Sequence, residues 1–412
     1  MMERLNTPDS NRKHIAFFGR RNAGKSSIFN LLLNQEISLV SDVPGTTTDP
    51  VYKSMELIGY GPVRIIDTAG LDDVGSLGKM RVEKTEEILQ KTDLAIYVLN
   101  AGKIDKEEKK EAKLFFQRFR IPYVFVWNKL DQLKEEERKK LRKENSGDSF
   151  LDENINLKRE NLLEIILKNL KEQEEDPPLI GDLAAYGSTV VLVVPIDSEA
   201  PKGRLILPQV QVIRECLDNG IKTVVVRETE LEETIKEIQK IDLVITDSQV
   251  FKTVDKIVPD HIPLTSFSML FARQKGDIRE FIKGIEALEE LKNKKEGTVL
   301  IAESCTHTTS HEDIGTVKIP NLLKKKINPN LKIIFQNGAT FKEKEFHMEN
   351  VDLIIHCGSC MITRKNMLNR IRIAEEKGVP ITNYGVTLAY LTGILDRAIK
   401  GTIPVSYTHL TL

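Results

Sequence analysis

Short runs of consecutive apolar residues alternate along the chain with longer stretches in which apolar residues recur at helical spacing. Continuous apolar runs are typical of strands that a sheet buries on both faces. Helices between successive strands favour a mainly parallel sheet. We therefore predict an α/β protein with strands in HIAFFG (14–19), VRIID (63–67), YVFVW (123–127), VVLVV (190–194), TVVV (223–226), DLVIT (242–246), TVLIAE (298–303), KIIF (332–335) and DLIIH (352–356).

The composition narrows the classes of function. The chain has 60 basic and 61 acidic residues, and this balance argues against a protein that binds nucleic acid by neutralising phosphates. No apolar run reaches the length of a membrane span, and residues 1–14 lack the apolar core of a signal peptide. We expect a cytoplasmic protein without a membrane or nucleic-acid partner, whose four cysteines stay reduced.

The first strand leads directly into a phosphate-binding loop, GRRNAGKSS at residues 19–27. In such a loop backbone N–H groups surround the phosphates, the lysine reaches the β- and γ-phosphate oxygens, and the hydroxyl after it contacts Mg²⁺. The predicted nucleotide-binding residues of this loop are Gly19, Asn22, Ala23, Gly24, Lys25, Ser26 and Ser27.

Two later strand ends identify the nucleotide. In DTAG, Asp67 is expected to hold Mg²⁺ through water, and the N–H of Gly70 to meet the γ-phosphate. In NKLD, which begins with Asn128 and Lys129, the carboxylate of Asp131 can pair with the guanine N1–H and 2-amino group. Adenine offers no such pair, so the chain is predicted to be a GTPase.

The segment between the first two motifs, DVPGTTTDP at 42–50, resembles switch I of Era and MnmE-like GTPases. That resemblance aligns Thr47 with the threonine that closes on magnesium, and Lys25, Ser26, Thr47, Asp67 and Gly70 are the predicted catalytic set. It also aligns Asn22 with the position that holds K⁺ in potassium-activated members. Asn22 has a second interpretation, as a residue that only shapes the loop.

Two features depart from the GTPase pattern. No glutamine follows DTAG, where only Asp72 and Asp73 are available. The Ser-Ala motif that usually supports guanine is missing, and residues 152–170 contain only a degenerate remnant of it with an amphipathic helix. We therefore expect slow, switch-like hydrolysis.

A chain of 412 residues exceeds what one core usually supports. The acidic run and paired prolines of KEQEEDPP predict a linker, and the character of the chain changes again near residue 276. We predict a P-loop GTPase domain at 1–172 and two further α/β domains at 177–276 and 277–404. The last eight residues, 405–412, differ in character, and we expect them to be a non-native tail.

Three of the four cysteines follow strands of the third domain. Cys305 follows the strand at 298–303, and Cys357 and Cys360 follow the strand at 352–356. Because the carboxyl ends of parallel strands share one sheet edge, these thiols are expected to meet. Three thiolates suit either a structural zinc site with one histidine or a 4Fe–4S cluster with one iron held differently. Cys216 lies on a predicted helix, and we expect an ordinary buried thiol there.

A GTPase joined to Cys-x-His, 48 intervening residues and His-Cys-x-x-Cys resembles the HydF family, the maturation GTPases and scaffolds of FeFe-hydrogenase. The resemblance runs from the phosphate loop to about residue 400 and implies a GTPase domain, a dimerisation domain and a cluster domain. It implies a homodimer or higher homo-oligomer that carries a di-iron precursor from radical-SAM maturases to the FeFe-hydrogenase apoprotein. It further implies that Cys305, Cys357 and Cys360 ligate a 4Fe–4S cluster.

The fourth corner of such a cluster has three candidate ligands, His356, His307 and Asp197, which directly follows a strand. His356 has an alternative structural role, because its side chain points opposite to that of Cys357 if the strand continues. A second class of function also stays open, an Era-like GTPase that binds the ribosome or RNA and has a zinc-stabilised C-terminal domain. The near-zero net charge weighs against it.

Overall fold

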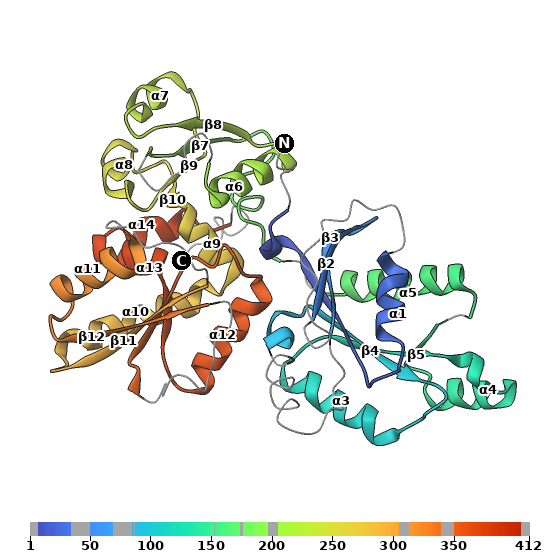
Figure 1. Cartoon of the computed structure of the whole chain (residues 1–412). Helices are drawn as coiled ribbons and strands as arrows, with labels where there is room; N and C mark the ends of the chain where they lie inside the picture. Colours follow the sequence, from blue (N-terminus) through green and yellow to red (C-terminus); the bar gives the residue numbers. More distant parts are fainter. Residues whose placement is uncertain are drawn as a thin grey trace. The chain divides into compact units, whose positions relative to one another are not determined.

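The computed structural model divides into two compact units, Met1–Glu175 and Asp176–Leu412. Within its described residues the first unit contains one six-stranded sheet, and the second contains two four-stranded sheets (Figure 1). Nearly all strand pairs are parallel, which confirms the predicted α/β class. The described residues are 7–33, 50–68, 85, 87–151, 153–173, 176–196, 205–304, 313–338 and 350–404.

The sheet of the first unit has the order β2-β3-β1-β4-β5-β6, and only β2 and β3 pair antiparallel. Its strands are β1 (Lys13–Phe18), β2 (Val51–Leu57), β3 (Gly61–Asp67), β4 (Leu94–Asn100), β5 (Tyr123–Asn128) and β6 (Ser149–Phe150). The helices are α1 (Lys25–Leu33), α3 (Lys106–Arg118), α4 (Glu135–Glu144) and α5 (Ile155–Lys171), with short turns η1 (Asp9–Asn11) and η2 (Leu130–Gln132).

Successive residues of β1 pack into two different cores, one on each face of this sheet. Ile15 packs with Ile28 of α1, whereas Phe18 packs with Phe116 of α3. Both β1 side chains are fully buried. A strand covered on both faces has no polar face to show, so its sequence is a continuous apolar run.

The second unit has sheets of order β10-β9-β7-β8 and β12-β11-β13-β14, parallel throughout. The strands are β7 (Thr189–Val193), β8 (Lys222–Val226), β9 (Leu243–Thr246), β10 (Leu264–Ser266), β11 (Gly297–Glu303), β12 (Leu331–Asn337), β13 (Leu353–His356) and β14 (Ile381–Asn383). The helices are α6 (Leu207–Asp218), α7 (Leu231–Glu237), α8 (Phe251–Ile257), α9 (Phe267–Lys275), α10 (Ile278–Asn293), α11 (Ile319–Lys326), α12 (Arg364–Glu376), α13 (Tyr384–Thr392) and α14 (Leu395–Lys400), and a π-helical turn, η3, spans Ile314–Lys318.

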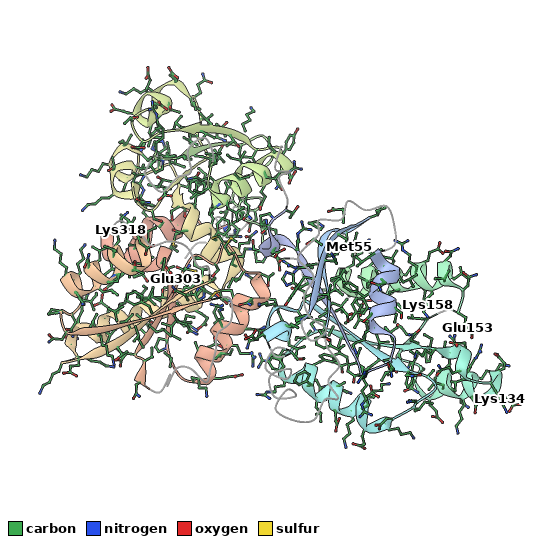
Figure 2. All side chains as sticks on the ribbon, in the orientation of Figure 1. Met55, Lys134, Glu153, Lys158, Glu303 and Lys318 are labelled. Carbon is green, nitrogen blue, oxygen red and sulfur yellow. The ribbon has the colours of Figure 1, made fainter. Side chains whose placement is uncertain are left out.

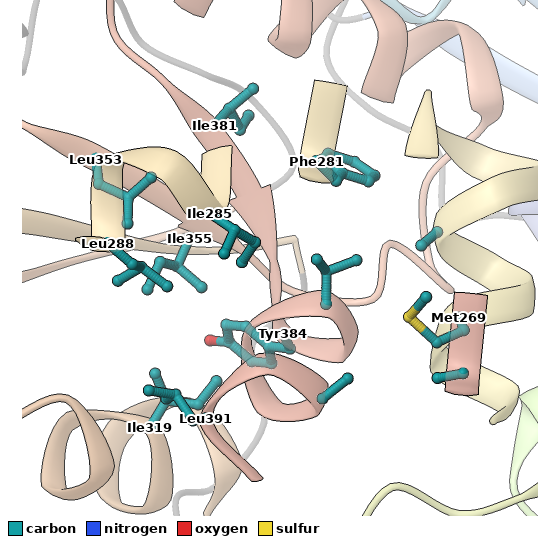
Figure 3. Close-up of a cluster of buried hydrophobic side chains, with 14 of the residues drawn as sticks. Met269, Phe281, Ile285, Leu288, Ile319, Leu353, Ile355, Ile381, Tyr384 and Leu391 are labelled. Carbon is teal, nitrogen blue, oxygen red and sulfur yellow. The ribbon is translucent and has the colours of Figure 1, made fainter. Parts of the chain in front are cut away.

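One hydrophobic core runs through both sheets of this unit. It contains Val191 of β7 and Leu288 of α10 together with Ile355 of β13. Part of this cluster, where α10 and α13 cover β13, is shown in Figure 3. A hydrogen bond of 3.0 Å from Thr265 Oγ1 to the carbonyl of Ala398 also joins the two parts. The segments 177–276 and 277–404 therefore share a core and form one compact unit.

Close backbone packing fixes the strand that borders β13. A Cβ atom at Gly284 of α10 would lie 2.4 Å from the carbonyl oxygen of Ile381 in β14. Only glycine allows this approach.

In the part of the chain that the structure describes, no helix has the length and apolar character that crossing a membrane requires.

His14 in β1 makes the first unit sensitive to acid. It is 7% exposed, and within the described structure neither ring nitrogen has a hydrogen-bond partner. Burial lowers the pKa of His14 to about 4, with Lys91 and Arg12 adding to the effect. An unfolded histidine has a pKa near 6.5, so below this pH the unfolded chain binds a proton that the folded one excludes. Stability should fall by up to about 3 kcal/mol between pH 6.5 and pH 4.

Urea unfolding at pH 7.5 and pH 5 tests this prediction. Trp127, the single tryptophan of the chain, lies in β5 and reports the first unit. The His14→Leu variant should lose less stability on acidification than the wild type. The control variant His261→Gln, which alters an exposed histidine, should behave like the wild type. Equal losses in His14→Leu and the wild type would contradict the prediction.

Candidate functional site

The loop after β1 has a backbone that glycine alone adopts without strain at two positions. Gly19 has φ +137° and Gly24 has φ +99°. A Cβ atom at Gly19 would lie 2.4 Å from the carbonyl oxygen of Val98, and one at Gly24 would lie 2.2 Å from Nδ2 of Asn128. The loop therefore packs directly on the carboxyl ends of β4 and β5.

Lys25, Ser26 and Asp67 come together at the start of α1. The Lys25 ammonium is buried and donates to the carbonyls of Gly19 and Arg20. The Ser26 hydroxyl donates to Oδ2 of Asp67 at 2.7 Å. Burial raises the pKa of Asp67, and the Ser26 hydrogen bond and the Lys25 charge oppose that shift.

The second carboxylate oxygen of Asp67 fits a cation. Oδ1 is buried and has no hydrogen-bond partner among the described residues. A hydroxyl and a carboxylate are the hard oxygen ligands that Mg²⁺ prefers. The residues present therefore fit Mg²⁺ at the end of β3.

Two residues of NKLD hold the phosphate loop. Asn128 Nδ2 donates to the carbonyl of Ala23 at 2.9 Å, and Lys129 Nζ donates to the carbonyl of Asn22 at 2.7 Å. Asn22 itself is left-handed, with φ 66°, a conformation that asparagine tolerates better than most residues. Asp131 lies on η2, exposed, immediately beyond. The predicted phosphate and guanine motifs thus form one connected site.

One residue of this site was not predicted. Lys158 of α5 donates from Nζ to Oδ1 of Asn128 at 2.7 Å. Lys158 lies in the segment from which the Ser-Ala motif is missing. The absence of that motif was the only sign in the sequence that another residue takes its place. Thr47 and Gly70 lie outside the described residues, so their predicted roles remain predictions.

The cysteine edge lies at the carboxyl ends of β11 and β13. These strands pair in parallel, with Ala302 opposite His356. The N–H of Ser304 donates to Sγ of Cys357 at 3.2 Å, and the hydroxyl of Ser304 lies 3.4 Å from the same sulfur. Ser304 is the residue before Cys305 in the sequence. Cys305 itself, His307 and Asp197 lie outside the described residues.

Cys360 lies one turn beyond Cys357 and is half-buried. The turn between them passes through Ser359, which has φ 60°. Burial and then the neighbouring Cys357 raise the pKa of the Cys360 thiol to about 11, and the Lys275 ammonium acts in the opposite direction. Cys216 is fully buried in the core between α6 and β7.

Both ring nitrogens of His356 have partners within the protein. Nδ1 lies 2.9 Å from the carbonyl oxygen of Cys357, and Nε2 lies 2.6 Å from Nη1 of Arg370. A guanidinium only donates, so Nε2 accepts and the proton resides on Nδ1. Burial, then the Arg370 charge, lowers the pKa of His356 to about 3. Coordination of a metal by Nε2 would require the Arg370 hydrogen bond to break.

Arg370 of α12 forms hydrogen bonds beside the cysteine loop, residues 357–360. It is 2% exposed, and it donates to Oδ1 of Asn366 at 3.0 Å and to the carbonyl of Gly338 at 3.1 Å. Burial lowers the pKa of Arg370 to about 10, and the charge of Cys357 opposes that shift. A buried cation at this edge favours an anionic ligand set.

A buried carboxylate, Glu303, ends β11 at the same edge (Figure 2). Its Oε1 accepts a hydrogen bond of 2.8 Å from the hydroxyl of Tyr384, whose pKa is raised by burial and then by Glu303. Sequence reasoning missed this pair, although Glu303 stands two residues before Cys305. Within the described ranges, which exclude Cys305, no three His, Cys, Asp or Glu side chains gather as a metal site.

Three family models match the chain. Residues 14–129 match the model described as 50S ribosome-binding GTPase. Residues 179–276 match the hydrogen maturase F dimerization domain, and residues 279–401 match the hydrogen maturase F tetramerization domain. The two hydrogen maturase F models together span more than half of the chain.

Two curated relatives each match about a third of the chain. The tRNA modification GTPase MnmE of Thermoanaerobacter sp. is 36% identical over 128 residues, 31% of this chain and 27% of the relative. The GTPase Der of Nitratiruptor sp. is 36% identical over 125 residues, 30% of this chain and 27% of the relative. The chain thus spans about a quarter of the length of these relatives. A crystal structure of Era from Aquifex aeolicus is 16% identical, with a TM-score of 0.31, and covers 59% of this chain and 97% of that chain.

Replacing Gly24 by alanine should weaken nucleotide binding by about 10- to 100-fold, because the new methyl group displaces Asn128 and its hydrogen bond to the loop. Equilibrium titration of purified variants with GDP measures the effect. The control is Gly147→Ala, since a Cβ atom there meets nothing within 4 Å. Wild-type affinity in Gly24→Ala would show that the loop tolerates the displacement.

Proposed function

Because the chain belongs to the hydrogen maturase F family, we propose that it hydrolyses GTP and serves as a 4Fe–4S scaffold in the maturation of FeFe-hydrogenase. In this proposal it receives a di-iron precursor made by radical-SAM maturases and delivers it to the hydrogenase apoprotein. The observation that carries the proposal is the contact between Ser304 and the sulfur of Cys357. Ser304 directly precedes Cys305, so the contact brings the segments that contain two of the predicted ligands to one sheet edge.

The GTPase part of the proposal assigns a task to each residue of the first site. The Lys25 ammonium exchanges its carbonyl partners for oxygens of the β- and γ-phosphates. The Ser26 hydroxyl and the Asp67 carboxylate would hold Mg²⁺, which supplies positive charge opposite the phosphates. Asp131 accepts from the guanine N1–H and 2-amino group. Thr47 and Gly70 complete the catalytic set.

Slow hydrolysis is part of the same proposal. The chain has no glutamine after DTAG to orient the attacking water. In this proposal the loop residues bind and orient GTP, but no glutamine orients the water that attacks the γ-phosphate. Such an enzyme suits a switch that changes state once in each cycle of assembly or delivery.

In the cluster part of the proposal, Cys305, Cys357 and Cys360 would hold a 4Fe–4S cluster, which supplies an iron corner open to exchange. The donor set fits this group. The N–H of Ser304 points at Sγ of Cys357, and such bonds stabilise a thiolate. The buried Arg370 guanidinium offsets negative charge at the same sulfur. His356, His307 and Asp197 are the proposed candidates for the fourth corner, and for Nε2 of His356 that role would require the Arg370 hydrogen bond to break.

The dimerization and tetramerization models support homo-oligomerization through the second unit. The alternative of a ribosome-associated GTPase rests on the first unit alone. The models that match residues 179–401 belong to hydrogen maturase F, so no observation favours that alternative.

Replacing Cys305, Cys357 or Cys360 by alanine should severely deplete the cluster, because each change removes one of three thiolates. The measurement is iron and sulfide content with the visible spectrum, after anaerobic reconstitution of each full-length variant. Cys216→Ala is the control, since this thiol lies on α6, fully buried in the hydrophobic cluster against which Cys360 packs, and not on the loops after β11 and β13, so its loss should leave the iron–sulfur cluster intact. Zinc without iron in the purified protein would sink the scaffold proposal.

The Lys25→Ala variant should lose GTP hydrolysis by about 100-fold or more, because the charge opposite the β- and γ-phosphates disappears. Phosphate release under saturating GTP measures the rate. Lys110→Ala, an exposed lysine of α3, is the control and should retain the wild-type rate. Unimpaired hydrolysis by Lys25→Ala would place the activity outside this loop.

Asn22 permits a clean test of a potassium site. If its side chain holds K⁺, exchanging K⁺ for Na⁺ should slow wild-type hydrolysis several-fold, and Asn22→Gly should lose that difference. Glycine keeps the left-handed backbone at φ 66°, so the loop shape is preserved while the carboxamide is removed. Equal rates in both salts for the wild type would leave Asn22 with the loop-shaping role.

A further inference from the structure

The chain between β6 and α5 lacks the usual guanine-supporting motif, and three backbone N–H groups at its two ends are already used. The N–H of Leu151 donates to the carbonyl of Trp127 at 3.0 Å. The N–H groups of Asn156 and Leu157 donate to Oδ1 of Asn154, which caps α5, at 3.0 Å and 3.5 Å. These three N–H groups are therefore already bonded and do not support the guanine base.

The first turns of α5 instead bring a lysine to the same place. Lys158 lies in the first turn of α5 (Figure 2). Its ammonium donates to Oδ1 of Asn128 at 2.7 Å. Asn128 is 3% exposed, and its Nδ2 donates to the carbonyl of Ala23 at 2.9 Å. Lys158 is thus one residue away from the phosphate loop and stands at the predicted guanine motif.

The O6 atom of guanine needs a hydrogen-bond donor beside Asp131. The guanine N1–H and 2-amino group pair with the carboxylate of Asp131, and the adjacent O6 is an acceptor. Lysine and arginine are the side chains that most often recognise the O6 edge of guanine. The neighbouring cation, Lys129, donates to the carbonyl of Asn22 at 2.7 Å and is directed to the phosphate loop. An ammonium has three N–H donors, so Lys158 can hold Asn128 and a base acceptor together.

We propose that Lys158 is a specificity residue for guanine and that its ammonium donates to O6 in place of the missing Ser-Ala motif. The inference rests on the proposed binding of GTP and deepens it. Asp131 reads the donor edge of the base, and Lys158 reads the acceptor beside it. Adenine has an amino group where guanine has O6, and the lysine would face that donor with another donor.

Three nucleotides separate this role from a purely structural one. GDP and inosine diphosphate both have O6, whereas 2-aminopurine riboside diphosphate has hydrogen in its place and also lacks the N1–H, so each nucleotide is judged by the ratio of its affinities for the variant and the wild type. In Lys158→Met, the affinity for GDP and for inosine diphosphate should fall by about 10- to 100-fold, the loss of one hydrogen bond from a charged group. The affinity for the 2-aminopurine nucleotide should change by less than about twofold. Competition against a fluorescent GDP, with the full-length protein, measures all three.

A matched control on the same helix is Lys168→Met, which removes an exposed lysine paired with Glu172 and should alter none of the affinities. Lys158→Arg should keep most of the affinity for GDP, because it retains a cationic donor. If Lys158→Met unfolds, Lys158→Leu, which likewise has no donor, replaces it with the same expectations.

An equal loss for all three nucleotides would overturn the inference, because Lys158 would then only position Asn128. Unchanged affinity for GDP in Lys158→Met would overturn it as well. A wild-type protein that binds no guanine nucleotide would instead overturn the proposed function, and this result is seen before any variant is measured.

Discussion

Parallel pairing of strands that are buried on both faces is the constraint on which both sites depend. It puts every carboxyl end of a sheet on one edge, so residues far apart in the sequence meet there. In the first unit Phe17 of β1 lies opposite Asp67 of β3, which sets the phosphate loop beside the carboxylate. In the second unit Ala302 lies opposite His356, which sets Ser304 beside Cys357. A shift of one residue in either register would turn these side chains to the other face of the sheet.

The two edges use this constraint differently. At the nucleotide edge the backbone comes close because glycine permits it, and side chains such as Asn128 then fasten the loop. At the cysteine edge a buried charged side chain fastens the backbone instead. Arg370 is buried and donates to Nε2 of His356, the residue before Cys357.

The cysteine loop is also tied to the preceding sheet. Arg364, at the start of α12, donates to the carbonyls of Gln274 and Gly276 at the end of α9, the latter at 2.7 Å. The two sheets of the second unit also share one core. The segments that match the dimerization and tetramerization models are therefore joined by a shared core and by these hydrogen bonds.

The sequence by itself determined the α/β class, nine of the strands and the motifs of the nucleotide site, whereas β2, β4, β6, β10 and β14 were not predicted. The predicted features follow from apolar runs and from fixed short spacings, which act within a few residues of the chain. The tertiary structure alone decided the contact of Lys158 with Asn128, the partners of His356, and the pairing of Glu303 with Tyr384. It also decided that the segments 177–276 and 277–404 share one core. Each of these depends on how helices pack over the sheets, and packing joins side chains whose distance along the chain leaves no periodic signal.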